Sequence, residues 1–95
     1  MFYVYNKAMY KVVVSKKAAK GMKNLPKGAK DVFFSLLADI QASGPVQPDY
    51  ANYSKLGNFT YHCHLSYHWV ACWRNEAGSI IVEVYYVGSR ENAPY

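Results

Sequence analysis

The sequence contains no long hydrophobic run. No apolar stretch approaches the roughly 20 residues that a helix needs to cross a bilayer. The apolar stretch 2–5 is too short for the core of a secretion signal, and no basic residue precedes it. We therefore expect a soluble cytoplasmic protein rather than one that spans a membrane or is exported.

Acidic residues are scarce, and they are absent from the first third of the chain. Residues 1–30 contain eight lysines and no acid, and all six acids lie between Asp31 and Glu91. The formal net charge is +5. A basic surface favours a polyanion or an acidic protein as partner, although lysines on a helix can also simply face solvent.

Cysteine is limited to Cys63 and Cys72, and the chain has no Cys-x-x-Cys motif. Without signs of secretion we expect both thiols to be reduced and to serve as small buried hydrophobic side chains. If the stretches 59–65 and 69–74 form a hairpin, the two thiols could come close to each other.

The first half of the chain has the pattern of a strand followed by two helices. Stretch 9–14 alternates like a strand, and Ser15 is a suitable N-cap for a short helix over 16–24. Apolar residues recur every three or four positions over 26–42, which predicts a longer amphipathic helix. Stretch 46–58 is rich in Pro, Asn, Asp and Tyr and indicates a loop.

Three strands are expected in the second half, over 59–65, 69–74 and 79–87. The order is then β-α-α-β-β-β, which predicts an α+β fold. We expect one domain, 1–95, in which two N-terminal helices pack on one face of a small, mainly antiparallel, four-stranded sheet. Its 52% apolar and 17% aromatic composition is that of a folded chain.

Two histidines lie on the polar face of the first of these three strands. In stretch 59–65 (FTYHCHL) the odd-numbered side chains are apolar or aromatic, and the even-numbered ones are polar. Because successive side chains on a strand point to opposite faces, His62 and His64 face the same way. We expect the helices to cover the apolar face and to leave the histidine face open for a ligand.

The arrangement resembles the RelE/ParE superfamily of bacterial toxins, nearest the YafQ/RelE-like branch that cleaves messenger RNA. The segment 62–65 (HCHL), followed by Trp69, is similar to a YafQ-type strand, which reads Asp-Cys-His followed by Asp-Trp. The segment 86–95 (YVGSRENAPY) is similar to the family ending, a strand that runs into Gly-x-Arg or Gly-x-His and then an aromatic residue. His62 and His68 depart from the pattern, since YafQ-like sequences carry aspartates there.

The resemblance implies a toxin of a type II toxin–antitoxin system, which would be an endoribonuclease. Enzymes of these branches need no metal or other cofactor and cut messenger RNA in the ribosomal A site, with the 2′-hydroxyl attacking the adjacent phosphorus. The implied partners are a cognate antitoxin, which we expect to be acidic, and messenger RNA on the ribosome. By the same resemblance, His64 and Trp69 match conserved positions, Arg90 matches the Arg or His position, and Tyr95 or Pro94 the terminal aromatic.

These residue types suit RNA cleavage, which needs a base, an acid and positive charge on the phosphate. Histidine exchanges protons near neutral pH, and arginine offers a planar fork to phosphate oxygens. The expected catalytic residues are His62, His64, Arg90 and Tyr95. Residues expected to bind substrate, some by stacking on a splayed base, are Tyr67, His68, Trp69 and Lys55. For Trp69, as for Trp73, a place in the core is favoured over a stacking role.

Three other readings stay open. His62, His64 and His68 are zinc-ligand types, but Cys63 alternates to the opposite face and the spacing matches no helical metal motif, so we expect no metal. A ParE-like toxin that inhibits DNA gyrase would share the fold without this chemistry. An inactive homologue that only binds an antitoxin is the third possibility.

Overall fold

The structure is a computed structural model, and it describes residues 10–77 and 79–95. Along the chain its elements are β1 Lys11–Val14, α1 Lys16–Lys23, α2 Lys27–Ser43, β2 Ser54–Lys55, β3 Thr60–His64, β4 Trp69–Arg74, β5 Ile81–Ser89 and the 3₁₀ turn η1 Arg90–Asn92. The predicted order of a strand, two helices and then strands is confirmed. The predicted strand 9–14 begins with one residue, Met9, that lies outside the described part.

Within the described residues the sheet has five strands, in the order β1-β5-β4-β3-β2. β1 runs parallel to β5, and every other pair is antiparallel. The prediction of four strands was one short, because the two-residue β2 lies in the stretch 46–58 that was expected to be a loop. A strand of two residues shows no alternation from which the sequence could reveal it.

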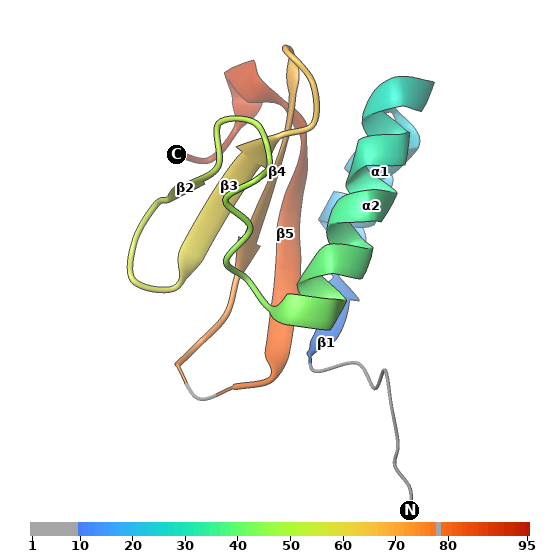
Figure 1. Ribbon diagram of the computed structural model, residues 1–95. Coiled ribbons are helices and arrows are strands. Elements are labelled where there is room, and N and C mark those ends of the chain that lie inside the picture. Colours follow the sequence, from blue (N-terminus) through green and yellow to red (C-terminus); the bar gives the residue numbers. More distant parts are fainter. Residues whose placement is uncertain (1–9, 78) are drawn as a thin grey trace, which may run out of the picture.

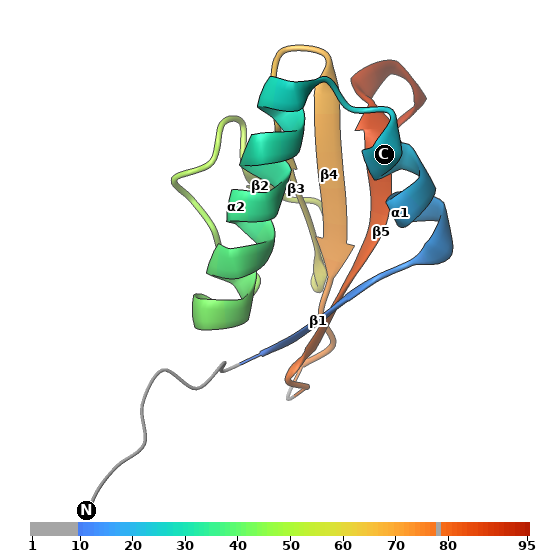
Figure 2. The same cartoon turned by 90° about the vertical axis from the view of Figure 1, so that its right-hand side faces the viewer.

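Both helices cover one face of the sheet, and the C-terminal segment lies on the other side (Figure 1). The same layers are seen after a quarter turn, with the helices in front of the strands (Figure 2). Within the described residues, no helix combines the length and apolar content that crossing a membrane requires.

The main core lies between the helices and the sheet. α2 buries Ala29, Phe33, Leu36 and Ile40, the stripe that its spacing predicted. Opposite it, the sheet contributes side chains of alternating positions, of which Trp73 is the largest that is fully buried. The prediction that the helices cover the apolar face is therefore confirmed. The opposite face is not left open as expected, because the C-terminal segment packs against it and His62 is buried.

α1 lies unusually close to the sheet at Gly21. A β-carbon built on Gly21 would come 1.8 Å from the carbonyl oxygen of Val87 on β5. Glycine in a helix costs about 1 kcal/mol relative to alanine, and this contact explains why the helix carries it. The other end of α1 is capped as predicted, since the Ser15 hydroxyl accepts from the amide of Ala18 at 3.1 Å.

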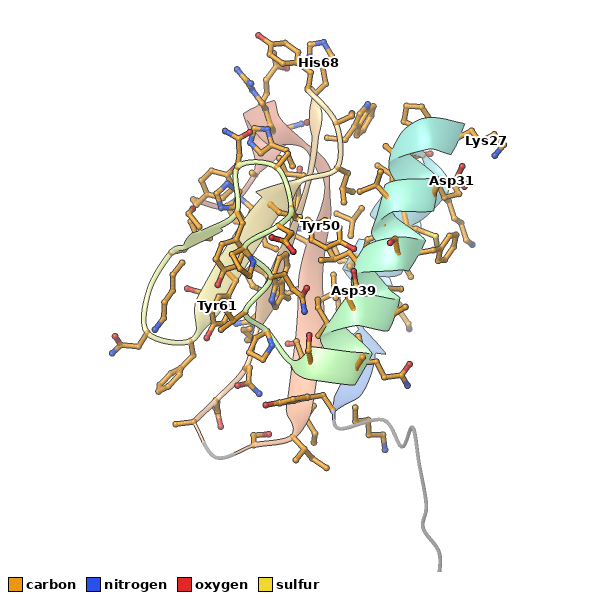
Figure 3. The ribbon with its side chains drawn as sticks, viewed as in Figure 1. Lys27, Asp31, Asp39, Tyr50, Tyr61 and His68 are labelled. Carbon is orange, nitrogen blue, oxygen red and sulfur yellow. The ribbon has the colours of Figure 1, made fainter. Side chains whose placement is uncertain are left out.

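The segment between α2 and β2 is tied to the rest of the fold by polar contacts. The hydroxyl of Tyr50 donates to Asp39 of α2 at 2.6 Å, and the two side chains point toward each other in Figure 3. The amide of Gln47 donates to the carbonyl of Asp39, and the indole of Trp73 donates to the carbonyl of Pro45 at 2.9 Å. These contacts fix where β2 meets the sheet.

The two cysteines are free and buried on opposite faces of the sheet. Cys63 belongs to the main core, whereas Cys72 packs in a second cluster with Val70 and Tyr86 on the other face. Cys63 lies opposite Ala71 in the β3–β4 ladder. The suggestion that the hairpin could bring the thiols together is wrong, because these positions differ by one step in alternation.

Candidate active site

His62 and His64 both lie on the face of β3 that the helices leave uncovered. Their cross-strand partners on β4 are Cys72 and Val70, which belong to the second cluster on that face. The two ring centroids are 5.8 Å apart, and the rings meet edge to face. His64 is half-buried, and His62 is only 8% exposed. The expected imidazole pair is thus present on the expected face.

The C-terminal segment folds back over this face. The amide of Arg90 donates to the carbonyl of His68 at 2.8 Å, which joins η1 to the loop between β3 and β4. Ala93 then packs against the second cluster. The ring of Tyr95 comes to rest 4.5 Å from the ring of His62, measured between centroids. Residues separated by more than thirty positions in the sequence therefore meet at one site.

Arg90 lies at the edge of the histidine pair. Its guanidinium carbon is 4.8 Å from the centroid of the Tyr67 ring. Its charge also acts on His64: burial first, and then Arg90, lower the pKa of that histidine. The arginine therefore brings positive charge and five N–H donors to the site that holds the imidazoles.

Both imidazoles favour the neutral form. Burial, and then the neighbouring His64, lower the pKa of His62, while a hydrogen bond to the backbone of Ser54 acts in the other direction. Burial also raises the pKa of the Tyr95 phenol, which stays protonated. At neutral pH the site thus contains two uncharged imidazoles, a neutral phenol and the charge of Arg90.

A β-bulge shapes the rest of this face. Cys72 pairs with Tyr86 and Trp73 pairs with Val84, so β5 carries one extra residue, Tyr85, at this point. Two successive tyrosines consequently pack against the second cluster instead of alternating. The bulge fills the middle of the face with aromatic side chains and confines the polar site to one end of the sheet.

Ser54 belongs to the site and was not among the expected residues. It lies directly opposite His62 in the β2–β3 ladder, and its hydroxyl oxygen is 3.0 Å from Nδ1 of that ring. The sequence held no signal for this contact, because β2 is too short to show a pattern. Only the pairing of β2 with β3 brings the hydroxyl and the ring together.

The structure does not bring all the expected residues to the histidines. Trp69 alternates with Ala71 and Trp73 and packs against the main core on the opposite face, so the core reading of Trp69 is the correct one. Lys55 lies opposite Tyr61 in the ladder and is exposed on the side of the sheet away from His62.

Tyr67 and His68 lie on the loop between β3 and β4. His68 is exposed at the end of the molecule, as Figure 3 shows, and its ring lies 4.7 Å from that of Tyr67. Tyr67 is 70% exposed. Together with Arg90 they form the rim of the site rather than its floor, where a flexible ligand could reach them.

No metal-binding cluster is found among the described residues. No group of three His, Cys, Asp or Glu side chains there is placed to hold an ion. Cys63 faces the helices and His68 lies on the loop. Of these four candidate ligands, only His62 and His64 are therefore neighbours on the same face of the sheet. The donor set does not fit a zinc site, which needs three or four convergent ligands.

Comparison with solved structures identifies the fold. The chain is similar to archaeal RelE in its complex with RelB from Pyrococcus horikoshii OT3, with a TM-score of 0.76, 18% identity and coverage of 90% of this chain and 99% of that one. The intact E. coli RelBE toxin–antitoxin complex matches with a TM-score of 0.68, 18% identity and coverage of 87% and 99%.

The YoeB dimer from Staphylococcus aureus matches with a TM-score of 0.68, 13% identity and coverage of 87% and 99%. The chain has the RelE fold. The predicted RelE/ParE-type architecture is therefore confirmed at the level of the fold. Neither a protein-family model nor a curated protein matches the sequence.

Proposed function

We propose that this protein is the toxin of a type II toxin–antitoxin pair and that it cleaves messenger RNA without a metal, as a ribosome-dependent endoribonuclease of the bacterial cytoplasm. The observation that carries the proposal is the convergence of His62, His64, Arg90 and Tyr95 on the face of a RelE fold that lies opposite α1 and α2 (Figure 1). These groups supply each requirement of phosphodiester transfer by the 2′-hydroxyl.

In the proposed reaction a neutral imidazole removes the proton of the 2′-hydroxyl. The 2′-oxygen then attacks the adjacent phosphorus, and the bond from phosphorus to the 5′-oxygen breaks. The second imidazole, protonated in the complex, gives its proton to the leaving 5′-oxygen. The products are a 2′,3′-cyclic phosphate and a free 5′-hydroxyl, so protons and electrons balance without a cofactor.

Arg90 is suited to the negative charge of the phosphorane. A guanidinium can donate two parallel hydrogen bonds to phosphate oxygens, and it keeps its charge throughout the reaction. Tyr67, 70% exposed beside Arg90, offers an aromatic face on which a splayed base could stack. Arg90 lowers the pKa of His64, and the negative charge of a bound phosphate would oppose this effect. His64 could then be protonated in the complex with RNA.

The expected protein partner is an acidic antitoxin. α1 carries Lys16, Lys17, Lys20 and Lys23 and no acid, and all four lysines are exposed. This surface favours a negatively charged partner. Two of the structural neighbours are complexes of RelE with RelB, one of them described as a toxin–antitoxin complex, which supports a partner of this class.

A cell-free translation reaction with primer extension on the messenger tests the proposal. The wild-type protein should cut at defined codons, and the double variant His62→Ala, His64→Ala should lose the activity while circular dichroism shows that it is folded. Unchanged cleavage by the folded double variant would refute the proposed site. Gyrase-dependent DNA breaks without RNA cleavage would point to a ParE-like toxin, and no effect at all to an inactive antitoxin-binding homologue.

A further inference from the structure

The contact between Ser54 and His62 links the shortest strand of the sheet to the more buried of the two imidazoles. The hydroxyl oxygen of Ser54 lies 3.0 Å from Nδ1, and the two residues are direct partners across the β2–β3 ladder. Because β2 has only two residues, its position depends on its neighbours: Tyr50 and Gln47 bond to Asp39 of α2, and the amide of His64 bonds to the carbonyl of Ala51 at 2.8 Å.

This contact determines where a neutral His62 carries its proton. A neutral imidazole has one N–H nitrogen and one nitrogen with a lone pair. A hydrogen bond at one of the two nitrogens selects which of these two tautomers, or forms, is present. The hydroxyl of Ser54 can accept a hydrogen bond from Nδ1–H. The backbone hydrogen bond to Ser54 acts to raise the pKa of His62, which is the effect of a carbonyl that accepts from the ring. The hydroxyl could also donate to an unprotonated Nδ1, but hydrogen on Nδ1 is compatible with both contacts, because the ring can then donate to Ser54.

The other nitrogen of the ring, Nε2, then carries the lone pair. Within residues 10–77 and 79–95, Nε2 of His62 makes no hydrogen bond, and every fully enclosed side-chain nitrogen or oxygen there does make one. Although His62 as a residue is only 8% exposed, Nε2 therefore keeps some contact with solvent. A general base needs this combination of a lone pair and access.

The other groups around His62 give no competing preference for which ring nitrogen carries the hydrogen. His64 lies beside it on β3, Tyr95 comes from the C-terminal segment, and Cys72 is its partner on β4. Burial raises the pKa of the Cys72 thiol to about 12 and also raises that of the Tyr95 phenol, so both are uncharged. The charge of Arg90 acts on the neighbouring His64.

We infer that Ser54 is a positioning residue that holds the proton of His62 on Nδ1, so that Nε2 of His62 is the base for the 2′-hydroxyl and His64, beside Arg90, is the acid. This inference rests on the proposed nuclease function. The 2′-hydroxyl proton passes to Nε2, and the imidazolium that forms keeps Nδ1–H donated to Ser54. His64 releases its proton to the 5′-oxygen as the bond to phosphorus breaks.

Two variants of Ser54 and one control separate a positioning role from a structural one. Ser54→Ala removes the hydroxyl, whereas Ser54→Thr keeps it on a strand-compatible side chain. Ser66→Ala is the control. Ser66 is exposed on the loop after β3, and its hydroxyl makes no hydrogen bond to any of the described residues. Long-range ¹H–¹⁵N spectra of the imidazoles report the form of His62 directly, without RNA.

Wild type, Ser54→Thr and Ser66→Ala should show His62 with hydrogen on Nδ1 at neutral pH. Ser54→Ala should show a mixture of the two forms. In single-turnover cleavage, Ser54→Ala should lower the rate constant roughly tenfold to a hundredfold and leave RNA affinity within about twofold, as for other residues that orient a catalytic group. Ser54→Thr should restore the wild-type rate and pH profile.

The inference is overturned if wild-type His62 carries its hydrogen on Nε2, or if Ser54→Ala changes neither the form of the ring nor the rate. These results leave the nuclease proposal standing as long as the wild type cuts RNA. If the wild type cuts no RNA, the nuclease proposal fails and the base role of His62 fails with it, whatever the spectra show.

Discussion

The histidine pair owes its properties to strand alternation and to what closes over each ring. His62 and His64 face the same way because they are two residues apart, and both rings sit on a cluster that contains Val70 and Cys72. Tyr95 covers His62, so burial dominates the lowering of its pKa. His64 is more open and also feels Arg90. The two imidazoles thus lie on the same strand face but differ in their exposure to solvent.

The lowered pKa values of His62 and His64 predict that stability falls in mild acid. Below about pH 6.5, the ordinary histidine value, unfolded imidazoles bind protons and the folded ones do not, so protons favour unfolding. The contribution to the free energy of unfolding is complete above that pH and is lost as the pH falls through the lowered folded-state values. Urea unfolding between about pH 8 and pH 5 should show the decline.

His64→Gln should reduce the steepness of this decline, because one of the two imidazoles with a lowered pKa is gone. His68→Gln is the matched control, since that ring stands exposed on the loop and the pair on β3 is left in place. A free energy of unfolding that stays level or rises as the pH falls from 6.5 toward 5 would contradict the neutral imidazoles.

Both cysteines should resist alkylation in the folded protein. Burial raises the pKa of Cys63 and of Cys72 to about 12, and neither side chain is exposed. Since the thiolate is the reactive form, iodoacetamide near pH 8 should label neither thiol in the folded state. Both should react once urea unfolds the chain, and mass spectrometry distinguishes the states. Rapid native labelling of Cys72 would show that the C-terminal segment opens.

At the scale of the elements, two local backbone features shape how the layers meet. The bulge at Tyr85 directs two tyrosines to the face opposite the helices, and Gly21 lets α1 rest against the backbone of β5. α1 has few apolar side chains, and Ala18 is the residue of this helix that is buried. Its docking therefore depends on close backbone contact more than on large side chains.

Gly21→Ala should destabilise the fold by about 2 kcal/mol or more, because the new methyl group would lie 1.8 Å from the carbonyl oxygen of Val87 and α1 must move. Gly28→Ala in α2 is the matched control: its β-carbon would meet nothing within 4 Å. That change should leave stability unchanged or raise it by up to about 1 kcal/mol. Urea unfolding measures both, and equal effects would argue against the close docking of α1.

At the scale of the whole molecule, the uncovered face has a different character at each end. Arg90 and the imidazoles occupy one end. At the other end Arg74 pairs with Glu83 at 3.1 Å and lies 4.0 Å from the centroid of the Tyr85 ring. The two arginines of the chain therefore differ in their surroundings: the charge of Arg74 is matched by a carboxylate, whereas the charge of Arg90 acts on His64.

Arg90→Ala should lower RNA cleavage roughly a hundredfold to a thousandfold, the usual cost of losing one group that stabilises charge in the transition state. Arg74→Ala removes the same charge from the chain and should leave cleavage within about threefold. Primer extension on a translated messenger measures both variants. Equal losses would mean that net charge, and not the position of Arg90, supports the reaction.

Several features of this protein could be predicted from the sequence. Apolar spacing in 26–42 placed α2 and its buried stripe, and alternation in 59–65 assigned His62 and His64 to the face away from the helices. The helix and the strand face are local features, since they depend on periodicities of 3.6 and two residues that any window of the chain displays. Arg90 was singled out differently, by the resemblance of the segment 86–95 to the ending of a known family.

Other features were decided by tertiary structure. β2 exists only because the loop after α2 is held against β3, so the contact of Ser54 with His62 had no counterpart in the sequence pattern. The same holds for Tyr95 over His62 and for the bulge at Tyr85, which depend on how β5 pairs with β4 and where its end returns. Such contacts join residues far apart in the chain, and no local periodicity encodes the register that brings them together.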